Sequence, residues 1–124
     1  SGLSSVKKIR DKRLFILHSI LIWSFYLLST YLCLFALHAL SNLGPVVALS
    51  VLVFGSLGML APVQGGIGAF HWIVAEGLTV YSISKFDGLA YATIIHSSQT
   101  LLVLFVGLMS MAMLIINSSK QLRQ

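Results

Sequence analysis

The sequence from residue 62 to residue 68 reads Pro-Val-Gln-Gly-Gly-Ile-Gly and interrupts an otherwise apolar chain. A regular helix cannot continue through this stretch, because proline lacks a backbone N–H and each glycine disfavours the helix by about 1 kcal/mol. A short apolar block lies on either side of it, residues 45–61 and 69–83. The stretch therefore predicts two short helices joined by an irregular, Gly-rich break.

Two longer apolar blocks lie outside the short ones, at residues 14–40 and 89–116, and neither contains Asp, Glu, Lys or Arg. Each exceeds the roughly 20 residues that a helix needs to cross a bilayer core. Only 9% of the chain is charged, whereas soluble domains carry about a quarter. We therefore expect an all-α, polytopic membrane protein whose membrane domain covers residues 14–116. Two long transmembrane helices should flank the pair of short ones.

The net charge of +5 comes from basic residues near the two ends of the chain. Residues 1–13 form a basic lead-in and residues 117–124 a basic tail, as is typical of segments that stay on the cytoplasmic side. This placement predicts a multi-pass protein of the cell inner membrane with both termini cytoplasmic. No basic face carries interleaved aromatic residues, so nucleic acid is not an expected partner.

Two topologies fit the short blocks. In one they form a re-entrant hairpin whose Gly-rich tip lies within the membrane, and in the other both cross fully and the break is a cytoplasmic loop. The hairpin is favoured, because both blocks are short and the break has no Lys or Arg. Irregular backbone is not tolerated against lipid, so a break at that depth has to border protein or a hydrated cavity.

The glycines at positions 65, 66 and 68 precede a helix start near Ala69. Backbone N–H groups at a helix start are suited to an anion such as a lipid phosphate, and glycine allows close approach. The alternative is that Gly65, Gly66 and Gly68 only form a tight turn. Gln64 has two equally open roles: it could bind a head group or cap the preceding helix.

Two ionisable residues follow the break. His71 lies in the first turn of the second short block, where it could reinforce an anion site, relay a proton or simply pack. Glu76 is the only carboxylate well inside an apolar block, and such residues are costly unless they have a function or reach the surface. At about 100° per residue the two should not share a helix face.

A polar stripe follows helical spacing in the last apolar block: Thr93, His96, Ser97 and Thr100, with Gln99 beside it. Such a stripe should face other helices or a cavity rather than lipid. It serves either interhelical hydrogen bonding or the wall of a substrate path.

Signatures of enzymes and metal sites are missing from the sequence. The single cysteine, Cys33, permits no disulfide within the chain, and neither HExxH, CxxC, GxSxG nor a phosphate-binding P-loop occurs. We therefore expect no enzymatic activity, no metal and no cofactor.

The stretch from Ala61 to His71, with its Pro followed by Gly-Gly-Ile-Gly, resembles the lysylphosphatidylglycerol synthase transmembrane family of flippase-like proteins. His96 to Thr100 and Gly107 also look like the last helix of one branch of that family. The resemblance implies that this chain is the C-terminal portion of a larger membrane domain. Its expected role would be moving lipids such as aminoacylated phospholipids or lipid-linked sugars between leaflets. In bifunctional members a separate soluble domain performs aminoacyl transfer, and that activity does not carry over.

One departure from the family bears on selectivity: many members have Glu where this chain has His71. The change disfavours a cationic aminoacyl-lipid and favours an anionic head group.

The leading hypothesis is a protein that translocates or binds a phospholipid or lipid-linked head group through a polar cavity. Its partners would be membrane lipids and either further helices of a longer chain or a second copy. The alternatives are a small-solute or proton-coupled transporter, and a transmembrane anchor for a lipid-modifying enzyme. The candidate substrate-binding residues are Gln64, Gly65, Gly66, Gly68, His71, Glu76, His96, Gln99 and Thr100.

Overall fold

The computed structural model describes residues 11–121, apart from the side chains of residues 117 and 119–121. Within this range the chain is all-helical, as predicted, with the elements α2 (Lys12–Leu34), α3 (Pro45–Met59), the short 3₁₀ helix η1 (Gln64–Gly66), α4 (Ala69–Thr79) and α5 (Lys85–Gln121). The basic residues expected to mark the cytoplasmic side at 7–10 and at 123 lie outside the described residues.

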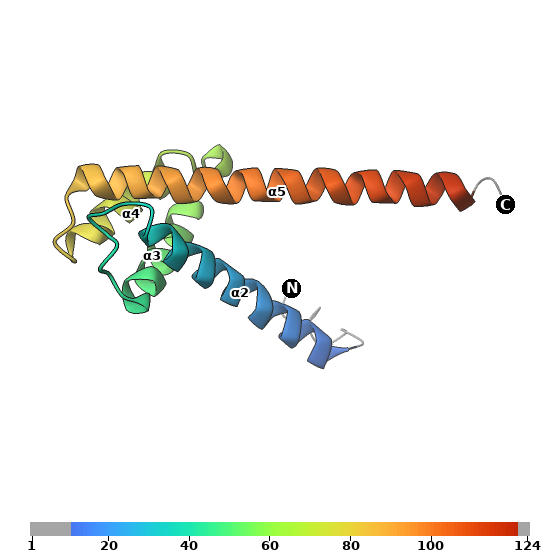
Figure 1. Cartoon of the computed structure of the whole chain (residues 1–124), viewed down its shortest axis with the longest axis horizontal. Helices are drawn as coiled ribbons and strands as arrows, with labels where there is room; N and C mark the ends of the chain where they lie inside the picture. Colours follow the sequence, from blue (N-terminus) through green and yellow to red (C-terminus); the bar gives the residue numbers. More distant parts are fainter. Residues whose placement is uncertain (1–10, 122–124) are drawn as a thin grey trace.

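Helices α2 and α5 diverge from one another like the arms of a V (Figure 1). The two short helices, α3 and α4, pack together at the closed end, against the C-terminal part of α2 and the N-terminal half of α5. The start of α2 and the end of α5 lie toward the open end of the V. The arrangement predicted from the sequence, two long helices flanking a short pair, is therefore confirmed.

Helix α2 begins where Asp11 accepts a hydrogen bond from the backbone N–H of Leu14, at 3.1 Å, which satisfies one of the free donors at the helix start. The helix ends at Leu34 rather than at Leu40, and residues 35–42 form successive turns instead. Leu34 and Leu40 are both fully buried in the core. The chain turns here, and the turn buries both side chains. The sequence around residue 34 contains no Gly or Pro, so it does not predict the end of the helix.

Helix α3 begins with Pro45, whose missing N–H is harmless in the first turn, and ends at Met59 shortly before Pro62. In the break that follows, Gly65, Gly66 and Gly68 all have positive φ angles, of 65°, 67° and 88°. Residues with a Cβ rarely adopt this conformation. The glycines are therefore required by the path of the backbone itself.

Helix α4 ends at Thr79, short of the predicted limit at residue 83, in a Schellman motif. The N–H of Ser82 donates to the Thr79 carbonyl at 2.9 Å and the N–H of Ile83 to the Leu78 carbonyl at 3.3 Å. Ser82 occupies the left-handed position, with φ 61°, that glycine usually fills. No glycine marked this helix end in the sequence.

Helix α5 starts at Lys85, four residues before the predicted apolar block, so residues 85–88 form its first turn. Ser84 caps it: its hydroxyl oxygen accepts the Asp87 N–H at 3.1 Å and its O–H donates to the Asp87 carboxylate at 2.6 Å. The Asp87 carboxylate also lies at the positive end of the helix dipole. Residues 84–88 therefore form the cap and first turn of α5, which extend the helix beyond its apolar block at the N-terminal end.

The core contains apolar side chains from all four α-helices. It holds Leu34, Leu40, Val47, Ala48, Val51, Phe70, Val74, Leu78, Tyr91, Ala92 and Ile95. Helices α3 and α4 approach so closely that a Cβ on Gly58 would lie 2.6 Å from the Cα of Phe70. The Tyr91 hydroxyl donates to the Thr30 carbonyl at 2.7 Å and ties α5 to α2 in the buried interior.

Only α2 and the Lys85–Ile116 part of α5 are long and apolar enough, among the described helices, to cross a membrane. In the most apolar 18-residue segment of each helix, 6% of the residues are buried in α2 and 0% in α5. Protein therefore does not cover these surfaces as it would in a soluble core. At 1.5 Å per residue, α3 is about 22 Å long and α4 about 17 Å, less than a hydrocarbon core of about 30 Å.

Candidate functional site

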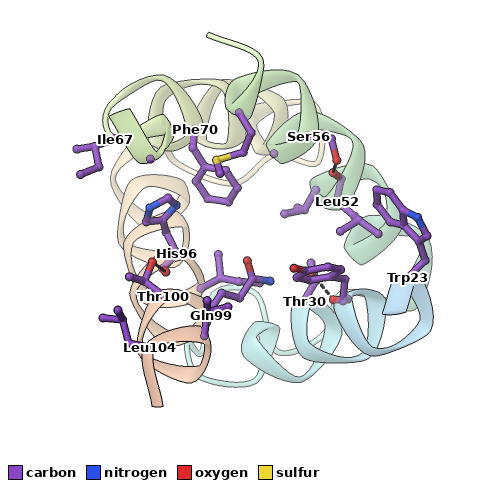
Figure 2. A pocket seen from close by; sticks show the side chains of 17 residues that line it. Trp23, Thr30, Leu52, Ser56, Ile67, Phe70, His96, Gln99, Thr100 and Leu104 are labelled. Carbon is purple, nitrogen blue, oxygen red and sulfur yellow. Dashed lines mark hydrogen bonds between the residues drawn. The ribbon is translucent and has the colours of Figure 1, made fainter. Parts of the chain in front are cut away.

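An open cavity of about 550 Å³ lies in the angle between α2 and α5, with α3 and the break along its side (Figure 2). We call it the central hollow. Its lining is predominantly apolar, and its volume is within the range of pockets that hold small ligands. Its lining residues are Trp23, Tyr26, Thr30, Val51, Leu52, Gly55, Ser56, Met59, Gly65, Ile67, Phe70, Ile95, His96, Gln99, Thr100, Val103 and Leu104.

The wall of the central hollow formed by α5 has three polar side chains, His96, Gln99 and Thr100, and further polar groups lie on α2 and α3. His96 and Trp23 lie on opposite walls, and Gln99 extends from α5 into the space between them (Figure 2). The Thr100 hydroxyl donates to the His96 carbonyl at 2.8 Å. Among the described residues, neither the Gln99 amide nor the His96 ring nitrogens have a hydrogen-bond partner, although both side chains are half-buried. Half-buried groups without partners are positioned to bind a polar ligand or water.

Three rings meet at the edge of the hollow nearest the break. The centroids of His71 and His96 are 5.0 Å apart, and Phe70 lies 5.0 Å from His96 and 5.8 Å from His71. The contact joins the first turn of α4 to the N-terminal third of α5, and the rest of α4, a turn and the start of α5 separate the two residues in the sequence. It places the two histidines together, which their spacing in the sequence does not predict.

A second cavity, of about 460 Å³, runs between α4 and the start of α5, and we call it the side groove. Its lining residues are Ile67, Gly68, His71, Trp72, Ala75, Glu76, Lys85 and Leu89. An ion pair joins the Lys85 ammonium to the Glu76 carboxylate at 2.6 Å. Ile67 lines both cavities, so the side groove and the central hollow adjoin at the break.

The predicted substrate-binding residues divide between these two cavities. Gly65, His96, Gln99 and Thr100 line the central hollow, whereas Gly68, His71 and Glu76 line the side groove. The other two line neither cavity: Gly66 is buried, with its Cα facing Met59, and Gln64 is exposed in η1. His71 and Glu76 were not expected to share a helix face, yet they line the same groove because the first turns of α5 form its other side.

Two of the three glycine N–H groups in the break have partners inside the protein. The Gly66 N–H donates to the Val63 carbonyl at 3.1 Å, and the Gly68 N–H donates to Nδ1 of His71 at 3.3 Å. Because Nδ1 accepts this bond, the proton of a neutral His71 resides on Nε2. An anion at the break would have to compete with these bonds, so side chains carry most of the binding potential.

The polar stripe predicted in the last block is split by the structure. His96 and Thr100 line the central hollow, but Thr93 and Ser97 are exposed away from it. The Thr93 hydroxyl donates to the Leu89 carbonyl within α5, at 2.8 Å. The helix is rotated so that Tyr91, Ala92 and Ile95 enter the core, and this rotation takes Thr93 to the opposite face.

Most of the residues that line the two cavities, among them several aromatic side chains and Lys85, were not among the predicted ones. Lys85 lies outside the predicted apolar blocks, and no binding role was predicted for Trp23, Tyr26, Phe70 or Trp72. The N-cap sequence Ser84-Lys85-Phe86-Asp87 was the signal that Lys85 begins a helix. Within residues 11–121 no three His, Cys, Asp or Glu side chains gather in a way that suits a metal ion.

Comparison with families of known proteins gives a match over most of the chain. The model of the lysylphosphatidylglycerol synthase TM region matches residues 3–107, which is most of the chain and includes the break and both cavities. Comparison with curated proteins and with solved structures found no match. Together with its exposed apolar helices, the match establishes that this chain is a membrane protein and belongs to the lysylphosphatidylglycerol synthase transmembrane family, which is associated with lipid modification.

Proposed function

We propose that the central hollow receives the head group of a membrane lipid and carries it between leaflets. The observation that carries this proposal is that two α5 side chains, His96 and Gln99, have no hydrogen-bond partner among the described residues and lie in a predominantly apolar hollow between two exposed apolar helices. An amphiphile suits such a site, because its head group satisfies the polar groups while its acyl chains stay in the bilayer. A head group bound here would avoid much of the cost of crossing hydrocarbon.

The chemistry of the central hollow favours a phosphate-bearing head group. Its polar lining offers hydrogen-bond donors from His96 and Gln99, and none of the described residues that line it has a carboxylate. Phosphate oxygens accept hydrogen bonds and are repelled by carboxylates, so this lining suits them. His71 lies beside His96, and a second histidine next to the central hollow is consistent with the same preference for phosphate.

The topology that we propose is a re-entrant hairpin formed by α3 and α4, with the break inside the membrane and both chain termini cytoplasmic. The shortness of α4 supports it, since about 17 Å cannot cross the hydrocarbon core. The positions of α2 and α5 support the placement of both termini on one side of the membrane, because their free ends point toward the same side of the V. The irregular backbone then borders the central hollow, through Gly65 and Ile67, rather than lipid alone.

A lipid-scrambling assay in protein-containing vesicles tests the proposal. Phospholipids with an acyl-chain fluorophore report their transfer between leaflets through a quencher added outside. The variants Gln99→Leu and His96→Phe keep side-chain volume but remove the polar groups, and each should slow transfer about tenfold or more, the loss expected for a hydrogen bond to a charged group. Thr93→Val and Ser97→Ala are matched controls on the same helix that face away from the hollow. Wild-type transfer by both hollow variants would overturn the proposal.

A second candidate, a proton-coupled small-solute transporter, is favoured by the contact between His71 and His96, because adjacent imidazoles can relay protons. Measurements on one preparation of protein-containing vesicles distinguish the two functions. Uptake of a soluble substrate driven by a pH gradient, without lipid transfer, would support the second and count against the first.

A further inference from the structure

We propose that the side groove is a binding site for the head group of a zwitterionic phospholipid, with a phosphate and an ammonium, such as that of phosphatidylethanolamine. The inference rests on the proposed function in taking a membrane lipid as the ligand. It goes further by assigning a second site with its own selectivity. The site is the groove between α4 and the start of α5 that holds the Glu76–Lys85 ion pair.

The groove presents one charge of each sign at bonding distance. The Lys85 ammonium and the Glu76 carboxylate are 2.6 Å apart, and their side chains are 69% and 37% exposed. An exposed ion pair contributes little to folding stability, so its partners can be exchanged for those of a ligand at low cost. A zwitterionic head group offers the matching pair, with its phosphate toward Lys85 and its ammonium toward Glu76.

The remaining lining fits the same ligand. Trp72 is 65% exposed and lines the groove beside Glu76, and an aromatic face attracts an ammonium group. His71 adds a donor at the end nearest the break, whereas Ala75, Leu89 and Ile67 supply apolar surface. An anionic lipid would satisfy Lys85 but leave the Glu76 carboxylate facing a second negative charge.

The position of the groove links it to the central hollow. Ile67 lines both cavities, and it lies between Gly66 and Gly68, whose backbones have positive φ angles. His71 of the groove contacts His96 of the hollow, with ring centroids 5.0 Å apart. A head group leaving the central hollow past Ile67 therefore enters the groove, where Glu76 and Lys85 select among the lipids that arrive.

Tryptophan quenching by brominated lipids tests the assignment, because Trp72 lies in the groove itself. The protein is placed in phosphatidylglycerol vesicles with equal mole fractions of either brominated-acyl phosphatidylethanolamine or brominated-acyl phosphatidylglycerol. The emission of Trp72 is taken as the difference between each protein and the same protein with Trp72→Phe. We expect quenching by the ethanolamine lipid to exceed that by the glycerol lipid several-fold. Equal quenching by the two lipids would overturn the proposal.

Charge variants identify the groups responsible. Glu76→Gln should abolish the preference for the ethanolamine lipid, and Lys85→Gln should weaken quenching by both lipids. Asp11→Asn and Arg13→Gln make the same changes in net charge far from the groove, and Asn still caps α2, so both should keep the preference. If Glu76→Gln kept the preference while folded, as judged by its thermal unfolding, the assignment to the ion pair would be wrong.

Two further arms separate the sources of the signal. Soluble glycerophosphoethanolamine should not restore Trp72 emission, and restoration would show that the groove takes a free head group rather than a lipid. The Gln99→Leu variant should retain the preference even when its scrambling is slow, because the groove does not include Gln99. Loss of scrambling with retained preference would therefore count against the central hollow only, and normal scrambling without preference against the groove only.

Discussion

The imidazole rings of His71 and His96 lie 5.0 Å apart, where the side groove meets the central hollow. One ring belongs to the first turn of α4, where its Nδ1 accepts the Gly68 N–H, and the other to the N-terminal third of α5. The contact couples the conformation of the break to the wall of the hollow.

The first prediction concerns this pair. His71→Phe and His96→Phe should each lower the scrambling rate about tenfold, equivalent to about 1.4 kcal/mol in barrier height. Because the rings are in contact, the double variant should be no slower than the slower single variant, since coupled residues are not additive. Scrambling rates of the four proteins check this, and fully additive losses would show that the two histidines act separately.

The second prediction concerns the contact between α3 and α4. A Cβ on Gly58 would lie 2.6 Å from the Cα of Phe70 and 3.0 Å from its N, so the two helices would have to separate. Gly58→Ala should therefore lower the unfolding free energy by about 1–3 kcal/mol. Gly107→Ala is the matched control, since nothing lies within 4 Å of its added Cβ, and it should be neutral or stabilise by up to about 1 kcal/mol. Unfolding in detergent measures both, and equal effects would contradict the close helix contact.

The third prediction concerns the buried hydrogen bond between α5 and α2. Tyr91→Phe removes the hydroxyl that donates to the Thr30 carbonyl and should destabilise the protein by about 1–2 kcal/mol. Tyr26→Phe is the control, because its exposed hydroxyl has no hydrogen-bond partner among the described residues. Thermal unfolding of the two variants distinguishes them. A Tyr91→Phe protein as stable as Tyr26→Phe would mean that the bond does not hold the two long helices together.

The fourth prediction concerns the turn between α4 and α5. Ser82 has a φ of 61°, a conformation that costs an L-residue about 1–2 kcal/mol relative to glycine. Ser82→Gly should therefore raise stability by up to about 1 kcal/mol, because the greater freedom of glycine when unfolded offsets part of the gain. Ser84→Ala should lower stability by about 1 kcal/mol through loss of the α5 cap, whereas Ser84→Thr should keep it, because threonine retains the hydroxyl. Chemical denaturation tests all three, and a destabilised Ser82→Gly would contradict the left-handed turn.

The fifth prediction concerns the depth of the break. In a Cys33→Ala background, Ile67→Cys should react with a small, charged, thiol-directed reagent, because Ile67 borders both cavities. The reaction should be slower than that of Arg13→Cys at the start of α2, and an ethanolamine phospholipid should slow it further. Labelling as fast as at position 13 would show that the break lies in open water, and no labelling would show that water does not reach it. Either result would contradict a hydrated path through the membrane.

Much of the architecture was predictable from the sequence alone. Two uncharged blocks, each longer than the bilayer core requires, determined the long helices, and the Pro62–Gly68 stretch determined the break between the short ones. These features depend on local chemistry: apolar length, a missing N–H and backbone angles that only glycine adopts readily. The composition also excluded a soluble fold, since few charged residues are available for a polar surface.

Only the tertiary structure decided where the long blocks turn and which polar residues meet. The end of α2 at Leu34 follows from burying Leu34 and Leu40 in one core, and the rotation of α5 follows from burying Tyr91 and Ile95. That rotation directs His96 and Gln99 into the central hollow and Thr93 away from it. The pairing of Glu76 with Lys85 likewise depends on the turn between α4 and α5. Contacts between distant segments depend on packing shape, and hydrophobic periodicity within one helix carries no information about its neighbour.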